Sequence, residues 1–393
     1  MQRVIVLGAS GFLGRRVLAV LAASDWAAPV AVSRRPHAFP RVPPPRRGAR
    51  GEGGDTCGPA APASTERLAC DATRPAELLR LLEGADAVVN CTAGPPADTV
   101  AIARALARAP AACRIVHVSS MAVYGPATGL VDEATPLPDD LRGYGGAKIA
   151  AERALSEHPN HVVLRPGCIF GPGSGQWTLR IARLLRAGRL GDLGAAGDGA
   201  CNLAPLDDVV AAVLVALRRP VAGMAFNVAV PNPPSWNAFL IRFAIALDAT
   251  PVARIPARQL RLEARLALPL HAAALALRRV SPRAAARVPD ALTPSLLALL
   301  RQDITLDHRR ADRLLGFART PLGDALAQAA KSLHPAASLH PAQVRPTTRP
   351  AVARTPLAGA SGALSRVPPA SAAPPTRELA ADRLPAPDPA HVA

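Results

Sequence analysis

The chain has 393 residues, of which 49% are hydrophobic and 19% charged, so it can bury a sizeable core and is not wholly disordered. Its 46 Lys and Arg residues exceed the 29 Asp and Glu residues, which gives a net charge of +17. The arginines are spread along the chain and aromatic residues make up only 3% of it, which argues against a nucleic-acid partner.

Lysine and tyrosine are scarce in this sequence. Arginine carries nearly all of the positive charge, and the only lysines are Lys148 and Lys331, while the only tyrosines are Tyr124 and Tyr144. A composition so rich in arginine, alanine and proline indicates coding bias. The few lysines and tyrosines that remain are therefore candidates for a specific role.

The cysteines and the apolar runs predict the cellular compartment. The six cysteines include no C-x-x-C pair, which fits neither a disulfide scaffold nor a zinc ribbon and favours a reducing compartment. The apolar run at residues 4–7 stops at Gly8, too early for a signal peptide, and no run reaches the roughly 18 apolar residues of a membrane-spanning helix. We expect a soluble cytoplasmic protein without a metal site.

The first predicted element is a strand at residues 3–7, followed by the sequence GASGFLG at residues 8–14 and a helix at 15–23. Glycines in such a turn let backbone N–H groups approach a pyrophosphate, and the N-terminus of the helix adds its partial positive charge. This arrangement predicts dinucleotide binding, with a plain structural turn as the alternative. The expected contacts are Gly8, Ser10, Gly11, Phe12, Leu13 and Gly14.

A second predicted strand at residues 30–32 ends in Ser33, Arg34 and Arg35. An NAD site usually has an acidic residue here, whereas an arginine suits the 2′-phosphate of NADP. We therefore expect Ser33 and Arg34 to contact the cofactor and prefer NADP(H), with NAD(H) as the alternative. Two ordinary surface arginines are a further interpretation. The proline-rich residues 36–65 then predict a low-complexity loop insertion.

Further short apolar runs at residues 87–90, 115–118 and 161–164 follow amphipathic stretches such as 75–82 and 99–108. Continuous apolar strands separated by helices are typical of a parallel sheet covered on both faces. The predicted fold class is α/β, a doubly wound parallel sheet of the Rossmann type. A smaller, mostly helical C-terminal substrate-binding part and a disordered tail complete the prediction.

The sequence YGGAK opens the next predicted helix and places Tyr144 and Lys148 four residues apart on one helical face. A neighbouring ammonium favours the phenolate form of tyrosine, which suits proton transfer to or from a carbonyl oxygen. The alternative is an exposed tyrosine and a solvated lysine. With the glycine-rich loop upstream, a catalytic pair is the favoured interpretation.

Several motifs together resemble the extended short-chain dehydrogenase/reductase family, which includes the NAD-dependent epimerase/dehydratase enzymes. Besides the glycine-rich loop, they are SSMAVYG at 119–125, YGGAK at 144–148, LRPGCIFGPG at 164–173, LDDV at 206–209, FNV at 226–228 and DHRRADRLLGF at 307–317. The resemblance covers about residues 1–330 and implies an NAD(P)-dependent oxidoreductase or epimerase.

The resemblance also implies roles for individual residues. Tyr144 would be the general acid/base, Lys148 would bind the nicotinamide ribose and lower the pKa of the tyrosine, and Ser120 would hydrogen-bond the reacting oxygen. For Asp71 the alternative to a cofactor contact is an N-terminal helix cap before Pro75. The further cofactor contacts implied by the family are Asp71, Ala72, Thr92, Ala93, Pro166 and Gly167.

Departures from subfamily patterns narrow the reaction. Met121 and Ala122 stand where sugar-nucleotide 4,6-dehydratases carry an Asp-Glu pair, which argues against dehydration. Cys168 stands where many sugar-nucleotide epimerases carry an asparagine, which weakens the epimerase interpretation without excluding it. Residues 171–173 and 197–202 look more like the 3β-hydroxysteroid dehydrogenase and dihydroflavonol reductase branches. We expect a secondary alcohol or ketone substrate, with a hydrophobic, steroid- or flavonol-like molecule favoured. A nucleotide-sugar epimerase and a non-catalytic NADP-sensing regulator are the alternatives.

The predicted organisation has three parts. Residues 1–167 are the NAD(P)-binding part with the catalytic pair, 168–332 are mainly the substrate-binding part with returning Rossmann elements, and 333–393 are a disordered Pro/Ala-rich tail. The basic segment 254–287 predicts an ordinary helix pair with solvated arginines, and contact with a membrane surface is the minor alternative. The family suggests a homodimer.

Overall fold

The computed structural model describes residues 1–34, 65–280 and 292–333. The predicted loop insertion lies outside the described residues except for Thr65, and the predicted tail lies outside them except for Leu333. Arg35 and residues 281–287 of the basic segment also lie outside them.

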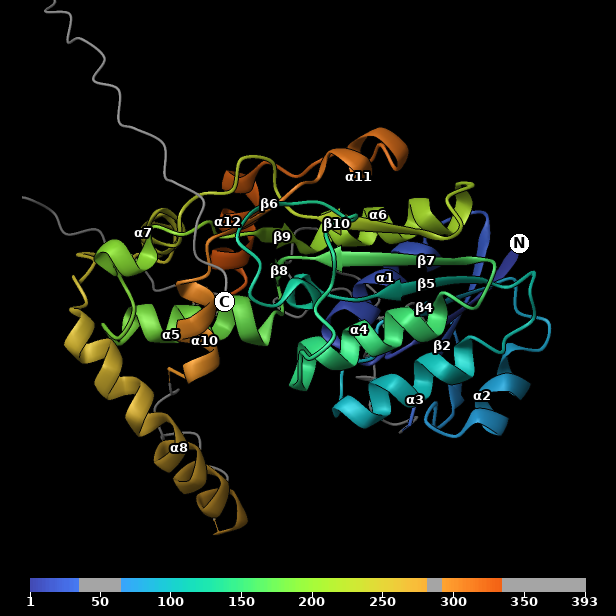
Figure 1. Cartoon of the computed structure of the whole chain (residues 1–393), viewed down its shortest axis with the longest axis horizontal. Coiled ribbons are helices and arrows are strands. Elements are labelled where there is room, and N and C mark those ends of the chain that lie inside the picture. The colour runs from blue at the N-terminus through green and yellow to red at the C-terminus, as the bar shows by residue number, and fades with distance from the viewer. Residues whose placement is uncertain (35–64, 281–291, 334–393) are drawn as a thin grey trace, which may run out of the picture. The chain divides into compact units, whose positions relative to one another are not determined.

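The largest sheet of the described chain has seven parallel strands and lies to one side of the helical C-terminal part (Figure 1). Its strand order is β10-β7-β5-β4-β1-β2-β3, so the order reverses between β1 and β4, where open α/β sheets bind their ligands. The strands are β1 (Gln2–Leu7), β2 (Ala27–Ser33), β3 (Glu66–Ala69), β4 (Ala87–Asn90), β5 (Arg114–Val118), β7 (His161–Pro166) and β10 (Met224–Val228). The predicted fold class is confirmed.

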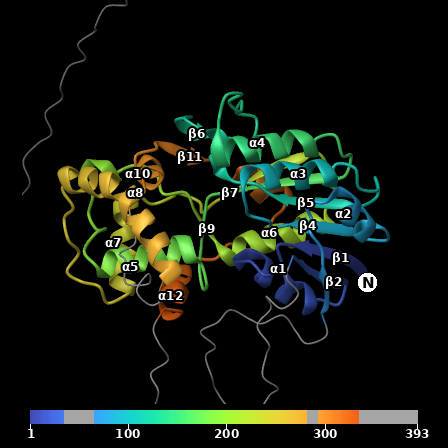
Figure 2. The ribbon, with the colours of Figure 1, turned by 90° about the horizontal axis from the view of Figure 1, so that it is seen from below.

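Helices cover both faces of this sheet, as Figure 2 shows. On one face lie α1 (Phe12–Ala22) and α6 (Leu206–Arg218), and on the other lie α2 (Pro75–Leu82), α3 (Pro96–Leu106) and α4 (Gly143–Leu155). Alternate side chains of β1 enter the two cores: Val4 and Val6 pack on the α1/α6 side, whereas Ile5 and Leu7 pack on the α2/α3 side. Because both faces of the strand are buried, its sequence is apolar throughout.

The C-terminal part is mostly helical and has its own core. Its aromatic centre contains Trp236 and Phe239, whose ring centroids lie 6.1 Å apart. Two small sheets pair β6 (Gly129–Val131) with β11 (Ile304–Leu306) and β8 (Cys168–Phe170) with β9 (Leu203–Pro205). The helices are α5 (Arg180–Arg186), α7 (Trp236–Ala246), α8 (Ala257–Val280), α10 (Pro294–Leu300), α11 (Arg309–Leu314) and α12 (Leu322–Lys331), with short helical turns at Met121–Tyr124, Gly175–Leu179 and Gly194–Gly197.

A helix pair was predicted in the basic segment, but its described part forms one helix, α8, that continues through Pro269. A proline inside a helix removes one backbone hydrogen bond, but the surrounding Ala, Leu and Arg residues are strong helix formers. Leu260 packs into the C-terminal core, whereas Leu262 is 56% exposed. Within the described residues, no helix is long and apolar enough to cross a membrane.

Candidate active site and cofactor pocket

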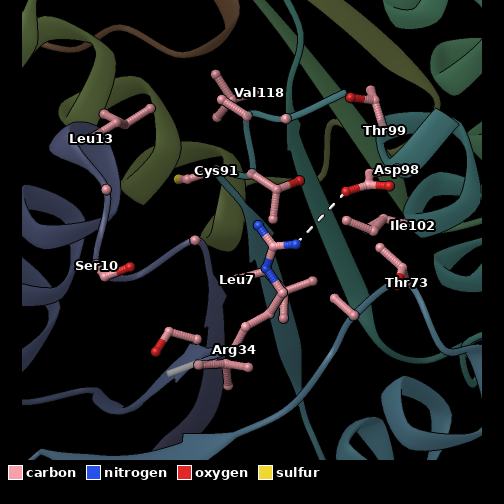
Figure 3. Close-up of a pocket in the computed structure, with 18 of the residues that line it drawn as sticks. Leu7, Ser10, Leu13, Arg34, Thr73, Cys91, Asp98, Thr99, Ile102 and Val118 are labelled. Carbon is pink, nitrogen blue, oxygen red and sulfur yellow. Dashed lines mark ion pairs between the residues drawn. The ribbon is translucent and has the colours of Figure 1, made fainter. Parts of the chain in front are cut away.

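A pocket of about 380 Å³ lies at the carboxyl ends of β1, β2, β4 and β5 (Figure 3). Parallel strands place the loops that follow them at the same sheet edge, which brings residues distant in sequence together. The volume is within the usual range of small-molecule sites. The lining includes these residues expected from the sequence: Gly8, Ser10, Gly11, Phe12, Leu13, Ser33, Arg34, Asp71, Ala72, Thr92, Ala93, Tyr144 and Lys148.

The glycine-rich loop has a backbone that other residues would disturb. Gly8 has φ +75°, and a Cβ there would lie 2.9 Å from the carbonyl carbon and oxygen of Cys91. A Cβ at Gly14 would lie 2.3 Å from the carbonyl oxygen of Gly8. Gly14 does not line the pocket, so its role is close packing of α1 against the end of β1.

The N-terminus of α1 faces this loop. The N-cap residue is Gly11, which has no side chain to accept a hydrogen bond from the first turn, and no acidic residue occupies that turn. Backbone N–H groups at the start of a helix without a capping side chain attract an anion, and the helix dipole adds to the attraction. The Gly8 turn and the Gly11 cap therefore fit the pyrophosphate of a dinucleotide.

Charged side chains gather at the end of the pocket near β2. Arg34 is 68% exposed, and its Nη1 lies 3.9 Å from Oδ2 of Asp98 on α3; Figure 3 shows the side chain extending toward that carboxylate. Asp71 lines the same pocket and accepts hydrogen bonds from Thr73 N at 3.2 Å and Thr73 Oγ1 at 2.8 Å. These bonds lower the pKa of Asp71.

The structure does not support the helix-cap alternative for Asp71. The N-cap residue of α2 is Arg74, with no side-chain capping bond, and Asp71 instead closes a turn with Thr73. The carboxylates of Asp71 and Asp98 give this end of the pocket two acids beside one arginine. No acid directly follows β2, but Asp71 after β3 and Asp98 on α3 bring acids to the same end of the pocket.

Tyr144 lines the pocket, whereas Ser120 lies next to Tyr144 without lining the pocket itself. Tyr144 lies in the first turn of α4 and is 53% exposed, and the Ser120 hydroxyl, which follows β5, hydrogen-bonds it. Partial desolvation in the pocket raises the pKa of Tyr144, and the bond from Ser120 lowers it by a smaller amount. The expected lowering by Lys148 is not what the structure shows: its Nζ lies 6.0 Å from the centroid of the Tyr144 ring, and the net pKa shift is upward.

Lys148 is buried beside the pocket, with 3% of the residue exposed. Its Nζ donates a hydrogen bond to the Val118 carbonyl at 2.8 Å. Burial lowers the pKa of Lys148 to about 8, while the nearby Cys91 and Glu152 raise it. The ammonium therefore titrates near physiological pH, unlike an exposed lysine.

Thr92 is held by side chains of the neighbouring strands. Asn90 Oδ1 accepts hydrogen bonds from Thr92 N at 3.1 Å and Thr92 Oγ1 at 2.7 Å, and Asn90 Nδ2 lies 3.0 Å from His117 Nδ1. His117 is fully buried, and burial holds its pKa well below the usual value. The loop after β4 thus keeps Thr92 and Ala93 at the pocket wall.

Two expected contacts lie away from the pocket lining. Pro166 ends β7 and pairs with Val228 of β10, and a Cβ at Gly167 would lie 2.1 Å from the Asn202 carbonyl oxygen. These residues form a tight junction between the sheet and the C-terminal part. Ile169, two positions after Gly167, lines the pocket instead.

Several pocket residues were missed by the sequence analysis. Asp98, Thr99 and Ile102 lie on α3, which begins soon after β4, and Cys91 and Ser119 directly follow β4 and β5. Their place in the sequence could have identified them, because residues just beyond the carboxyl ends of central parallel strands converge at this edge of the sheet. In the described ranges, no group of three or more His, Cys, Asp or Glu side chains could hold a metal ion.

Comparison with known proteins now identifies the class. A model of the NAD dependent epimerase/dehydratase family matches residues 4–229, which is more than half of the chain. The chain therefore belongs to the NAD-dependent epimerase/dehydratase family. Among curated proteins, Protein YeeZ of Escherichia coli K12 is 31% identical over 144 residues, which are 35% of this chain and 47% of YeeZ. The chain spans about half the length of the curated relatives it matches.

Solved structures share the fold. UDP-glucuronic acid 4-epimerase from Bacillus cereus in complex with NAD has a TM-score of 0.58 at 16% identity, covering 84% of this chain and 98% of that one. The human epimerase family protein SDR39U1 with NADPH has a TM-score of 0.55 at 20% identity, covering 84% and 100%. An NAD(P)-type cofactor is consistent with both neighbours and with the glycine-rich pocket.

Proposed function

We propose that the protein is an NAD(P)-dependent oxidoreductase that transfers hydride between the nicotinamide ring and the carbon of a secondary alcohol or ketone. The observation that carries the proposal is that Tyr144 and Lys148 line the glycine-rich pocket together, with Ser120 next to Tyr144. The bound cofactor supplies or accepts the hydride, and the protein provides proton transfer and orientation.

Each of the three side chains has a distinct part in this proposal. The Tyr144 hydroxyl exchanges a proton with the substrate oxygen, and Ser120, which hydrogen-bonds Tyr144, orients the same oxygen. The Lys148 ammonium holds the cofactor ribose from its buried place on α4. Because the pKa of Tyr144 is raised, the phenol stays protonated at neutral pH, which favours proton donation to a ketone.

For the cofactor, we propose a preference for NADP(H). Arg34 lines the pocket where the 2′-phosphate of NADP would lie, and an arginine can bind a phosphate through two parallel hydrogen bonds. Asp98 and Asp71 at the same end oppose an additional phosphate charge, so NAD(H) is the alternative.

Two substrate classes remain as candidates. The first candidate is a hydrophobic, steroid- or flavonol-like molecule, and it is supported by the sequence motifs at residues 171–173 and 197–202. A nucleotide-sugar epimerase is the second candidate, and it is supported by family membership and by the UDP-sugar epimerases among the structures of similar fold. An epimerase would hold its cofactor tightly and change external NAD(P)H by no net amount, whereas a dehydrogenase would consume or produce it.

Replacement of Tyr144 by Phe tests the mechanism. We expect turnover of a carbonyl, alcohol and sugar-nucleotide panel to be abolished, while the affinity for NADPH or NADH, measured by fluorescence titration, is retained. Tyr124→Phe is the matched control, since the Tyr124 hydroxyl is buried and donates to Asn227 at 2.7 Å. That variant should lose stability, and its turnover should fall far less than that of Tyr144→Phe.

The outcomes of this experiment separate the alternatives. Retained turnover in Tyr144→Phe would overturn the proposed role of Tyr144. Cofactor binding by the wild-type protein without turnover of any member of the panel would favour the non-catalytic NADP-sensing regulator.

A further inference from the structure

Three consecutive residues after and at the end of β5 contact three residues of α4 that lie four positions apart. Residues at this spacing share one face of a helix, so the end of β5 and the residues after it meet a single face of α4. The pairs are Val118 with Lys148, Ser119 with Glu152 and Ser120 with Tyr144. The proposed function uses two of these α4 residues and leaves Glu152 without a role.

Glu152 is a buried carboxylate with defined partners. Only 8% of it is exposed, and Ser119 Oγ donates a hydrogen bond to its Oε1. Arg165, 6% exposed on β7, donates from Nη2 to Oε2 at 2.7 Å and from Nε to both oxygens at 3.1 and 3.2 Å. Burial of a charge is costly unless its partner is close, so this carboxylate is confined to one place.

The position of Arg165 is itself determined by the core. Its Nη1 donates to the Tyr124 hydroxyl at 3.1 Å, and its guanidinium carbon lies 5.2 Å from the centroid of the Tyr124 ring. Tyr124 in turn donates to Asn227 Oδ1 on β10 at 2.7 Å. The Glu152 carboxylate is thus linked to strands β7 and β10 of the seven-stranded sheet through Arg165, Tyr124 and Asn227.

We propose that Glu152 is a positioning residue that, through Ser119 and Arg165, fixes the end of β5 against α4 and so holds the Lys148 ammonium beside the pocket. These contacts are made within the protein and need neither cofactor nor substrate. Only their consequence for cofactor binding rests on the proposed function.

The charges around Lys148 make this role measurable. The titratable groups that face it are Cys91 after β4, His117 on β5, and Tyr144 and Glu152 on α4. Burial raises the pKa of Cys91 to about 12 and keeps His117 neutral, and Tyr144 is protonated at neutral pH. Cys91 and Glu152, which is paired with Arg165, both raise the pKa of Lys148, so replacement of Glu152 by Gln should lower that pKa.

Lysine scarcity allows a direct experiment. In protein labelled with carbon-13 at lysine Cε, only Lys148 and Lys331 give NMR signals, and Lys331→Arg assigns them. We expect the Lys148 signal of the free wild-type protein to titrate at about 8 and that of Glu152→Gln to titrate about one pH unit lower. Glu157→Gln, which removes the same charge from an exposed site just beyond α4, should leave the midpoint unchanged.

An unchanged Lys148 midpoint in folded Glu152→Gln protein would overturn the proposal. Because this variant leaves the Arg165 charge buried without its partner, it can fail to fold. The double variant Glu152→Gln/Arg165→Gln then serves, since it buries no unpaired charge, and its midpoint should also lie below that of the wild type. Because the titration needs neither cofactor nor substrate, its failure is distinguishable from failure of the proposed function, which Tyr144→Phe tests.

Discussion

Two glycines, Gly8 and Gly84, allow the cost of a strained backbone to be separated from the cost of a steric clash when a Cβ is added. Gly8 and Gly84 have nearly the same positive φ, +75° and +72°. A Cβ at Gly8 would lie 2.9 Å from the Cys91 carbonyl, whereas a Cβ at Gly84 would have no atom within 4 Å. The two positions therefore share the conformational penalty and differ in the steric one.

Gly8→Ala should thus cost more than Gly84→Ala. We expect Gly84→Ala to lower the free energy of unfolding by about 1 kcal/mol, the cost of a left-handed conformation. Gly8→Ala should lower it further and also weaken binding of NAD(P)H, because the shifted loop no longer presents its N–H groups. Urea unfolding and fluorescence titration measure the two effects. Equal losses in both variants would show that the close approach at Gly8 is unimportant.

Arg34 is the residue on which cofactor choice depends. Arg34→Ala should weaken NADPH binding by roughly tenfold or more, because a charge-assisted bond to the 2′-phosphate is lost. NADH binding should change little. Arg104→Ala, which removes an exposed arginine of α3 outside the pocket, is the charge-matched control. Equal weakening of NADPH and NADH would contradict the proposed preference.

At the scale of elements, the burial of a helix's side chains decides how much the helix contributes to the stability of the fold. The amphipathic pattern predicts α2 with the bounds that the structure shows, whereas α8 continues through Pro269 in a segment where a helix pair is predicted. Its leucines are chemically alike in sequence, yet Leu260 is 1% exposed within the C-terminal core and Leu262 is 56% exposed. The homodimer suggested by the family stays a prediction, which sedimentation equilibrium would test.

Leu260→Ala and Leu262→Ala form a matched pair for the packing of α8. Removal of the buried side chain should lower the free energy of unfolding by about 2–4 kcal/mol, because a cavity is left in the core. Removal of the exposed one should change it by less than about 0.5 kcal/mol. Urea unfolding of both variants tests this, and a similar loss in both would contradict the packing of α8 on its Leu260 side.

For the whole molecule, buried titratable groups make stability depend on pH. Burial and the nearby Lys148 hold the pKa of His117 well below its ordinary 6.5, so the native protein keeps this side chain neutral in mild acid. The unfolded chain binds a proton there below about pH 6.5. The unfolded state then carries more protons, and linkage requires stability to fall as the pH falls.

We therefore expect the free energy of unfolding to decrease from pH 7 to pH 5 by up to about 1.4 kcal/mol per pH unit from this one group. His117→Gln should flatten the dependence, although it also alters the contact with Asn90. Urea unfolding at several pH values measures the slope. An identical slope in His117→Gln would show that another group causes it.

The sequence by itself determined the parallel α/β class, the glycine-rich loop and the Tyr144/Lys148 pair, because these depend on local periodicity and on residues close together in the chain. It missed β3, whose four residues ERLA include two charged ones at an edge of the sheet, and the pairing of β10 beside β7.

Only the tertiary structure decided which distant side chains share the pocket. Asp98 lies opposite Arg34 because parallel strands bring their carboxyl ends to one edge. Ser119 contacts Glu152 because α4 packs against the end of β5. The same packing places Gly14 and Gly167 against neighbouring backbone outside the pocket lining, and desolvation raises the pKa of Tyr144. Such effects arise from desolvation and close approach, which a linear pattern does not contain.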